Sequence, residues 1–248
     1  MKLKLISCEV LYREMCSLVA RSPHQVDIEF LPKGLHDLGG AAMLERLQQM
    51  ADGADPRKYE AVAFGYGLCG NGIAGLVART VPLVVPRAHD CIALLMGSRE
   101  RYESYFEANP GVYFRSTGWL ERGENTDQLT LNLVRKRTGA GNTLEELIER
   151  YGEEDGRYLF EQLNTYQHTY RRLTYISTGL EPDGSLEQRA REEAAHRGWS
   201  FELVPGDLAL LERLLSGSWD ENDFLVVPPG WRITATYDGR VIDKEPAA

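Results

Sequence analysis

Short apolar runs bounded by Gly and Pro recur along the chain, and they predict strands buried on both faces of a parallel sheet. The two central runs are Ala61–Gly65 (AVAFG) and Val81–Val85 (VPLVV), and a helical pattern follows the second at once. The other expected strands are Leu3–Ser7, Val26–Leu31, Val112–Ser116, Leu173–Ser177, Phe201–Val204 and Phe224–Val227.

Segments with apolar residues at helical spacing separate these runs. The expected helices are Glu9–Ala20, Ala41–Met50, Ile92–Phe106, Asp155–Arg171, Leu186–Arg197 and Asp207–Leu215. A hairpin over Ile233–Ile242 turns at Asp238-Gly239, a favoured two-residue turn. The alternation of strands and helices predicts an α/β fold with a mostly parallel sheet, flanking helices and a C-terminal hairpin.

Two short repeats suggest two similar α/β lobes around a cleft. Ser116-Thr-Gly recurs as Ser177-Thr-Gly, and Val84-Val-Pro resembles Val226-Val-Pro. With this division we expect an N-terminal α/β lobe, a helical excursion and a second α/β lobe, at residues 1–121, 122–172 and 173–248. A single domain is the alternative.

Composition and charge exclude some classes of partner. The chain has 248 residues, 43% of them hydrophobic, as in an ordinary globular protein. A net charge of −9 without a basic tract argues against nucleic-acid binding. No apolar run approaches the roughly 20 residues of a membrane helix, and no signal-peptide core is present. We therefore expect a cytoplasmic protein with no nucleic-acid or membrane partner, whose four cysteines are thiols or metal ligands.

Three cysteines follow predicted buried strands. They are Cys8, Cys69 and Cys91, and His89 stands two residues before the last. If the strands are neighbours, their tips lie roughly 5–10 Å apart, because neighbouring strands are about 4.8 Å apart. Thiolates and an imidazole at one edge can share an ion. The pattern predicts a metal site: zinc if all four residues bind, or a 4Fe–4S cluster with one open iron if only the thiolates do. Cys16 is expected to be an inert buried helix residue.

Two alternatives use the same residues differently. Helix N-termini lower the pKa of a cysteine, so Cys69 or Cys91 could instead be a nucleophile with His89 as its base. The other alternative is a set of buried or surface thiols near a cleft, with no metal.

The loops after the central strands also carry residues suited to an anionic substrate. A glycine-rich turn, which includes Gly67, Gly70 and Asn71, can bring backbone N–H groups close to a ligand. Arg87 can hold a carboxylate or phosphate through two donors, or pair with a nearby Asp or Glu. His36, after the second expected strand, is the candidate for proton transfer or a further metal ligand.

Four strings in this sequence, GLHD, YGLCGNG, PRAHDCI and PGVYF…TGW, together resemble the domain-of-unknown-function family 1638, an uncharacterised bacterial and archaeal group. Its members look like neighbours of corrinoid-dependent methyltransferases. The resemblance therefore implies one-carbon metabolism, with a corrinoid protein or a methyltransferase as partner and a corrinoid as a further cofactor alternative. His89-x-Cys91 is also similar to the His-x-Cys pair of zinc-dependent thiol methyltransferases, although here Cys8 and Cys69 lie upstream of it.

We thus expect a metal-dependent α/β enzyme acting on a small thiol or anionic substrate, including by methyl transfer or hydrolysis. Its metal would leave an open position to activate a thiol or water. The alternative function is a noncatalytic accessory protein that binds a metal, a cluster or a corrinoid.

Overall fold

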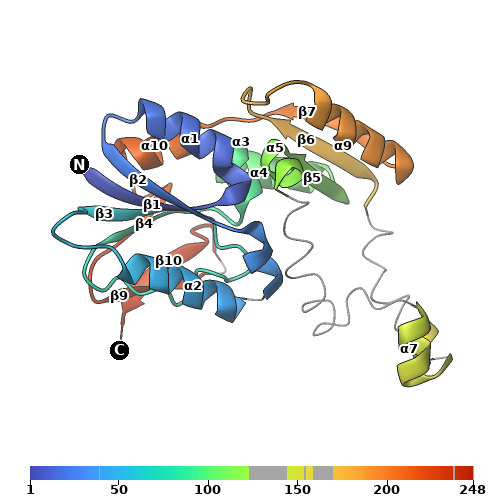
Figure 1. Cartoon of the computed structure of the whole chain (residues 1–248), viewed down its shortest axis with the longest axis horizontal. Coiled ribbons are helices and arrows are strands. Elements are labelled where there is room, and N and C mark those ends of the chain that lie inside the picture. The colour runs from blue at the N-terminus through green and yellow to red at the C-terminus, as the bar shows by residue number, and fades with distance from the viewer. Residues whose placement is uncertain (39, 123–143, 154, 159–169, 237, 248) are drawn as a thin grey trace.

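Two separate sheets organise the chain (Figure 1). The computed structural model describes residues 1–38, 40–122, 144–153, 155–158, 170–236 and 238–247, apart from the side chains of residues 36–38 and 150. The first sheet has the order β2-β1-β3-β4-β8 and the second the order β5-β6-β7. The strands are β1 (Lys2–Cys8), β2 (Gln25–Leu31), β3 (Ala61–Gly65), β4 (Leu83–Pro86), β5 (Val112–Ser116), β6 (Arg172–Ser177), β7 (Ser200–Pro205) and β8 (Phe224–Val227).

The predicted α/β class is confirmed. Strands β1 to β4 are parallel, β8 joins them antiparallel to β4, and all strands of the second sheet are parallel. One expectation was wrong: the strand Val112–Ser116, assigned to the N-terminal lobe of residues 1–121, was expected in the same sheet as the strands that precede the cysteines. That strand pairs instead with β6, in the register Ser116 to Ile176. Its apolar residues resemble those of the other strands, so the sequence could not identify its neighbour.

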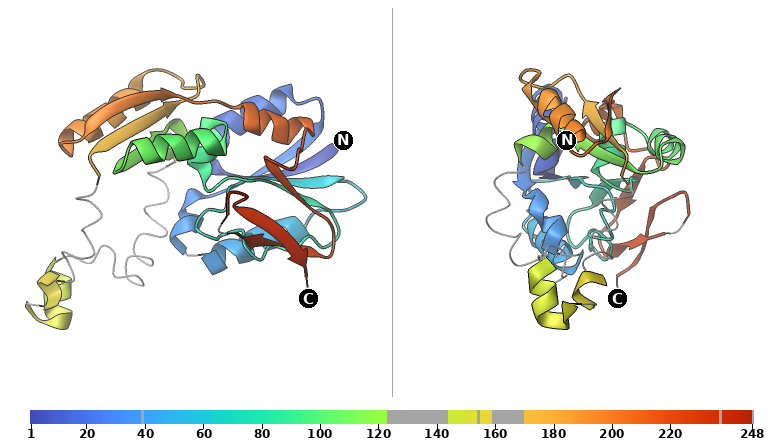
Figure 2. Two further views of the ribbon diagram at one scale, coloured as in Figure 1. Left: turned by 180° about the vertical axis from the view of Figure 1, so that it is seen from behind. Right: turned by 90° about the vertical axis from the view of Figure 1, so that its right-hand side faces the viewer.

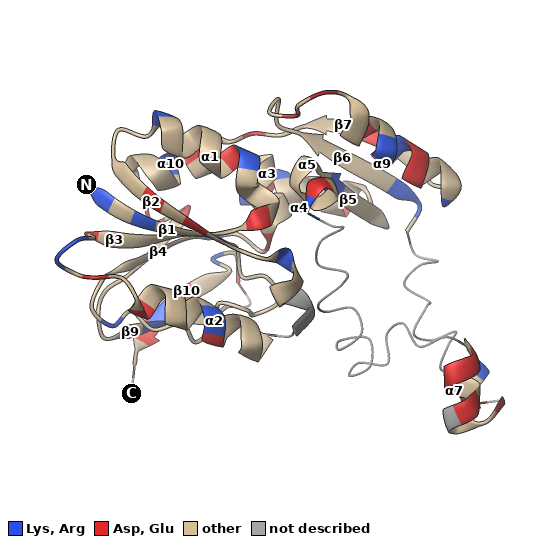
Figure 3. Cartoon of the chain, in the orientation of Figure 1, with Lys and Arg blue, Asp and Glu red and all other residues tan. Residues whose placement is uncertain are grey.

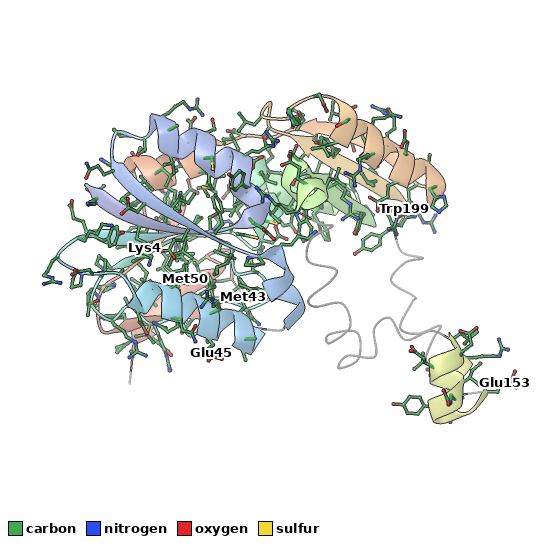
Figure 4. All side chains as sticks on the ribbon, in the orientation of Figure 1. Lys4, Met43, Glu45, Met50, Glu153 and Trp199 are labelled. Atoms are coloured by element: carbon green, nitrogen blue, oxygen red, sulfur yellow. The ribbon has the colours of Figure 1, made fainter. Side chains whose placement is uncertain are left out.

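Helices and a hairpin cover both faces of the first sheet (Figures 1 and 2). One face carries α1 (Tyr12–Arg21) and α10 (Ala209–Ser216); the other carries α2 (Gly40–Asp52) and the hairpin of β9 (Trp231–Ala235) and β10 (Ile242–Pro246). Met43 and Met50 lie between α2 and the sheet (Figure 4). The remaining elements are η1 (Glu9–Leu11), η2 (Lys33–Leu38), α3 (Cys91–Met96), α4 (Arg99–Ala108), α5 (Thr117–Glu121), α7 (Leu144–Tyr151) and α9 (Ser185–His196).

The helix expected over Ile92–Phe106 is two helices. Gly97 ends α3 with a φ of 82°, a left-handed conformation that glycine adopts without a Cβ clash. Ser98 then caps α4, its Oγ accepting a hydrogen bond from the Arg101 N–H at 3.1 Å. Most of the helix expected over 155–171 and most of the excursion expected after residue 121 lie outside the described residues.

The strands of each sheet do not come from one continuous half of the chain. β5 precedes residue 121 yet belongs to the second sheet, while β8 returns from the C-terminal region to the first. The two copies of each short repeat lie in the same sheet, not one copy in each lobe. Ser116 is in register with Ile176, and Val84 is in register with Val226. The repeats are therefore no evidence of duplicated lobes. Side chains at the ends of β6 and β7 also pack into the core of the first sheet, so the sheets are in contact.

A buried carboxyl group marks this contact. Glu14 of α1 is 1% exposed, and the Thr178 hydroxyl, just after β6, donates a hydrogen bond to it at 2.9 Å. Burial raises the pKa of Glu14 above its usual 4.5, and the nearby Glu181 and Glu121 carboxylates raise it further. The folded protein consequently keeps the Glu14 proton at a pH where the unfolded chain has lost it.

We expect Glu14→Gln to become more stable than the unmodified protein as pH rises from about 4.5. In that window only the unfolded chain ionises Glu14, so ionisation favours unfolding, by about 1.4 kcal/mol for each unit of pKa difference. Below the unfolded pKa the difference should disappear. Denaturant unfolding at several pH values between 4 and 8 measures this, with the exposed Glu107→Gln as control. If the free energy of unfolding of Glu14→Gln and that of the unmodified protein changed in parallel with pH, the expectation would be contradicted.

Candidate metal centre

Cys8, Cys69 and Cys91 follow three neighbouring parallel strands, as the sequence predicted. Cys8 is the last residue of β1, Cys69 lies four residues after β3, and Cys91 begins α3 after β4. β3 pairs with β1 on one side and β4 on the other. All three thiols are free and buried, between 3% and 7% exposed. Parallel strands with crossover helices end at one edge of a sheet, so these three cysteines share that edge.

The loop that carries Cys69 is fastened to the segment before Cys91. The Leu68 and Cys69 N–H groups donate to the carbonyls of Ala88 and His89, both at 2.8 Å. Gly67 allows this approach, because a Cβ there would meet the Ala88 oxygen at 2.7 Å. Cys69 has a φ of 51°, a left-handed conformation that is uncommon for a cysteine. Such strain is often found at functional positions, where the surrounding structure maintains it.

Cys91 is fixed by the cap of α3. The Asp90 Oδ1 accepts hydrogen bonds from the N–H groups of Ile92 and Ala93, at 2.9 and 3.1 Å. Its other oxygen accepts one from the Tyr102 hydroxyl at 3.1 Å. The Asp90 carboxylate is thus held beside Cys91 and places a negative charge near the thiol.

Burial makes all three cysteines weak acids. It raises the pKa of Cys8 to about 12, although the Val10 N–H and Lys33 partly oppose this effect. Burial is also the main cause of the raised pKa values of Cys69 and Cys91. A charge on Cys8 raises the pKa of Cys69, and charges on both raise that of Cys91. The three sulfur atoms are therefore close enough to repel one another as thiolates, but at neutral pH they remain protonated.

Two buried polar groups beside the thiols have no hydrogen-bond partner among the described residues: the Tyr66 hydroxyl and the Trp119 indole N–H. Burial raises the pKa of Tyr66, and the charges of Cys8, Cys69, Glu9 and Cys91 raise it further; Tyr66 and the three cysteines belong to the same buried core. The Trp119 N–H lies close enough to Cys91 to lower the pKa of that thiol. Buried polar groups almost always have partners, so two such donors beside three thiols suit an anionic centre or a bound ligand.

The side chains are not already arranged around a metal. Within the described ranges, no three His, Cys, Asp or Glu side chains are placed to hold an ion together. His89 is 44% exposed, and its Nε2 lies 3.4 Å from Glu103. Its backbone carbonyl, rather than its imidazole, contacts the cysteine loop. The structure thus brings the three cysteines together and leaves the His89 ring outside the group.

The other predicted site residues lie around this edge. Gly70 and Asn71 are exposed, and an added Cβ on Gly40 of α2 would lie 3.7–3.8 Å from their carbonyls. His36 belongs to η2, after β2, and its side chain lies outside the described part. The Arg87 guanidinium donates to main-chain carbonyls of Glu221, Arg240 and Ile242. Arg87 therefore faces the C-terminal hairpin and, among the described residues, forms no ion pair with an Asp or Glu.

Tyr66 and Trp119 were not among the predicted site residues. Tyr66 stands between two glycines directly after β3. Cys69 was chosen as a candidate because it follows the same strand. That position was an available signal. Trp119 also follows a strand end, but that strand, β5, belongs to the second sheet, so its position did not place it beside Cys91. Only the packing of α5 on η1 brings it there.

The burial of the thiols predicts a pattern of chemical reactivity. In metal-free native protein, we expect Ellman's reagent to modify the partly exposed Cys16 much faster than the other three cysteines, because the thiolate is the reacting form and those three are protonated and buried. Unfolding in guanidinium should release all four thiols. Rapid native reaction of Cys69 or Cys91, identified by mass spectrometry, would instead favour the nucleophile hypothesis.

The fold and this site define an α/β protein with a three-cysteine cluster at the carboxyl edge of a parallel sheet. The family model described as "Protein of unknown function (DUF1638)" matches residues 30–215. The chain belongs to the DUF1638 family. No curated protein and no solved structure matches the sequence. Among the described helices, none is both long and apolar enough to cross a membrane.

Proposed function

We propose that Cys8, Cys69 and Cys91 bind one metal centre, zinc or an iron–sulfur cluster, and that this centre acts on a small thiol or anionic substrate. The observation that carries the proposal is the burial of three free thiols after three adjacent strands, beside the unpartnered hydroxyl of Tyr66. Three protein thiolates leave one position of a tetrahedral zinc, or one iron of a cluster, open to a substrate.

Metal binding also explains how thiols with raised pKa values could function. A free nucleophile must ionise by itself, which burial opposes at all three positions. A metal ion supplies the positive charge that removes the proton from each ligand. The Tyr66 hydroxyl and the Trp119 N–H would then donate to the anionic sulfur atoms. Such supporting donors orient ligands and tune a metal centre.

The substrate chemistry follows from the open position. Zinc activates a thiol or water by stabilising its deprotonated form. The Gly70–Asn71 turn and η2, which carries His36, belong to loops after β3 and β2, beside the strand that ends at Cys8. We assign them to substrate contact and proton transfer. Methyl transfer to a thiol, with a corrinoid protein or methyltransferase as partner, is the reaction that the family resemblance favours.

Metal analysis and an absorption spectrum of anaerobically purified protein test the proposal. Stoichiometric zinc in a colourless protein, or iron and sulfide in a brown one, supports it and distinguishes the two centres. Protein that holds neither, even after reconstitution with each, would refute it.

Cobalt substitution then separates the enzyme from the accessory protein. Cobalt(II) in a zinc site reports its ligands through visible absorption. If one position is open, adding 2-mercaptoethanol should change the spectrum as the thiol binds. An unchanged spectrum would mean that the protein itself fills all four positions, as expected of an accessory protein.

A further inference from the structure

A second candidate site, separate from the cysteines, lies between β8 and the C-terminal hairpin, and Arg87 lines it. It is a pocket of about 820 Å³, within the range of about 300–1,000 Å³ typical of small-molecule sites. Its cationic lining residues are Arg87, Arg99, Arg240 and Lys244. The protein as a whole has a net charge of −9, and its charged groups of both signs are intermixed over the elements visible in Figure 3. With Glu221, Asp238 and Asp243 also in the lining, the pocket has an excess of one positive charge in a chain of net negative charge.

Two of the four cations have no carboxylate partner among the described residues. Arg87 donates through Nε to the Glu221 carbonyl at 2.9 Å and through Nη1 to the hairpin carbonyls, and its Nη2 has no partner in the described ranges. The Lys244 Nζ donates to the Val226 carbonyl at 2.7 Å and retains two further N–H donors. Main-chain carbonyls fix both groups without neutralising their charge. Both cations are thus held in place with donors to spare, as an anion site requires.

The negative groups in the pocket are mostly neutralised. Asp238 and Asp243 both pair with Arg240, at 2.8 and 2.5 Å. The Glu221 carboxylate has no ion pair in the described part of the chain, so it can accept a hydrogen bond from a ligand hydroxyl. Trp219 adds an apolar wall, with its indole N–H already donating to the Leu214 carbonyl at 2.8 Å.

We infer that this pocket binds a phosphorylated hydroxy compound, of the sugar phosphate class. Arg87 Nη2 and Lys244 would bind the phosphate, and Glu221 would accept from a hydroxyl. Two cations suit a phosphate dianion better than a single carboxylate. This inference does not depend on the metal centre, because none of the three cysteines lines the pocket.

Isothermal titration with ribose 5-phosphate, inorganic phosphate and ribose tests the inference on the whole protein. We expect saturable binding of ribose 5-phosphate, weaker binding of phosphate and none of ribose. Lys244→Gln and Arg87→Lys should each weaken ribose 5-phosphate binding by about tenfold or more, since each removes a charge-assisted contact. Glu221→Gln should tighten binding of inorganic phosphate by removing a repulsive charge.

Arg57→Gln is the matched control, because Arg57 is 90% exposed, pairs with Asp55 and does not line the pocket. It should leave the affinity unchanged. Lys244→Gln remains informative if the Arg87 variant loosens the hairpin. No binding of ribose 5-phosphate by the wild type, or equal affinity in wild type and Lys244→Gln, would overturn the inference. Equal affinities for phosphate and ribose 5-phosphate would overturn the sugar assignment.

Discussion

Replacing any one of Cys8, Cys69 and Cys91 by serine is expected to abolish stoichiometric metal binding. Each thiolate supplies one bond and one negative charge to the proposed centre, and the remaining two cannot complete the set. Loss of groups that only support a metal ligand weakens binding by about 10- to 100-fold, so loss of a ligand should exceed about 100-fold. Metal content after anaerobic purification and competition with a chelator measure the effect.

Two variants make this series decisive. Cys16→Ser is the matched control, since Cys16 lies on α1, is only partly buried and takes no part in the cluster. It should keep its metal. His89→Ala should also keep it, because the His89 ring lies beside Glu103. Loss of metal in His89→Ala together with the three cysteine variants would identify a four-ligand zinc site and correct this expectation. Full metal content in any of the three cysteine variants would exclude the proposed centre.

Gly118→Ala is expected to destabilise the protein by about 3 kcal/mol, at the upper end of ordinary overpacking costs. A Cβ at Gly118 would lie 1.7 Å from the carbonyl oxygen of Val10, so α5 and η1 must separate. The Val10 carbonyl belongs to the backbone and the backbone also fixes the position of the added Cβ, so no side-chain rotation can relieve the clash. Because Trp119 follows Gly118, this separation should also move the indole away from Cys91.

Denaturant unfolding measures the loss of stability, and near-ultraviolet circular dichroism reports the movement of the tryptophan. Gly184→Ala is the control, since nothing lies within 4 Å of the added Cβ and its φ of −80° suits alanine. That variant should differ from the wild type by less than about 1 kcal/mol. If Gly118→Ala were equally stable, α5 could not be packed on η1 as described.

The placement of the three cysteines at one edge of the sheet was predictable because parallel strands obey a simple rule. Apolar runs that feed helices become parallel strands, and parallel strands end at one edge of their sheet. The positions of Cys8, Cys69 and Cys91 soon after such runs were therefore enough to predict that they share that edge. The fold class and the C-terminal hairpin followed from the same reading of apolar spacing and turn residues.

The sequence did not predict which strands pair with one another. β8 is wholly apolar and β5 begins with three apolar residues, like the other strands, yet β5 starts the second sheet and β8 runs antiparallel in the first. Neither strand alternates between buried and exposed residues, so its pattern does not distinguish one neighbouring strand from another. Pairing between distant segments depends on how whole layers pack, which no short stretch of sequence records.

The sequence by itself predicted that the three thiols share an edge of the sheet, because residues that follow parallel strands of one sheet lie at the same edge whatever the strand order. The tertiary structure decided which way side chains at that edge turn. His89 and Arg87 lie within five residues of Cys91, yet one faces Glu103 and the other the C-terminal hairpin. Trp119, distant in sequence, reaches Cys91 because a glycine lets two backbones touch. Side-chain direction depends on the nearest partner in space, and that partner is fixed only when the layers pack together.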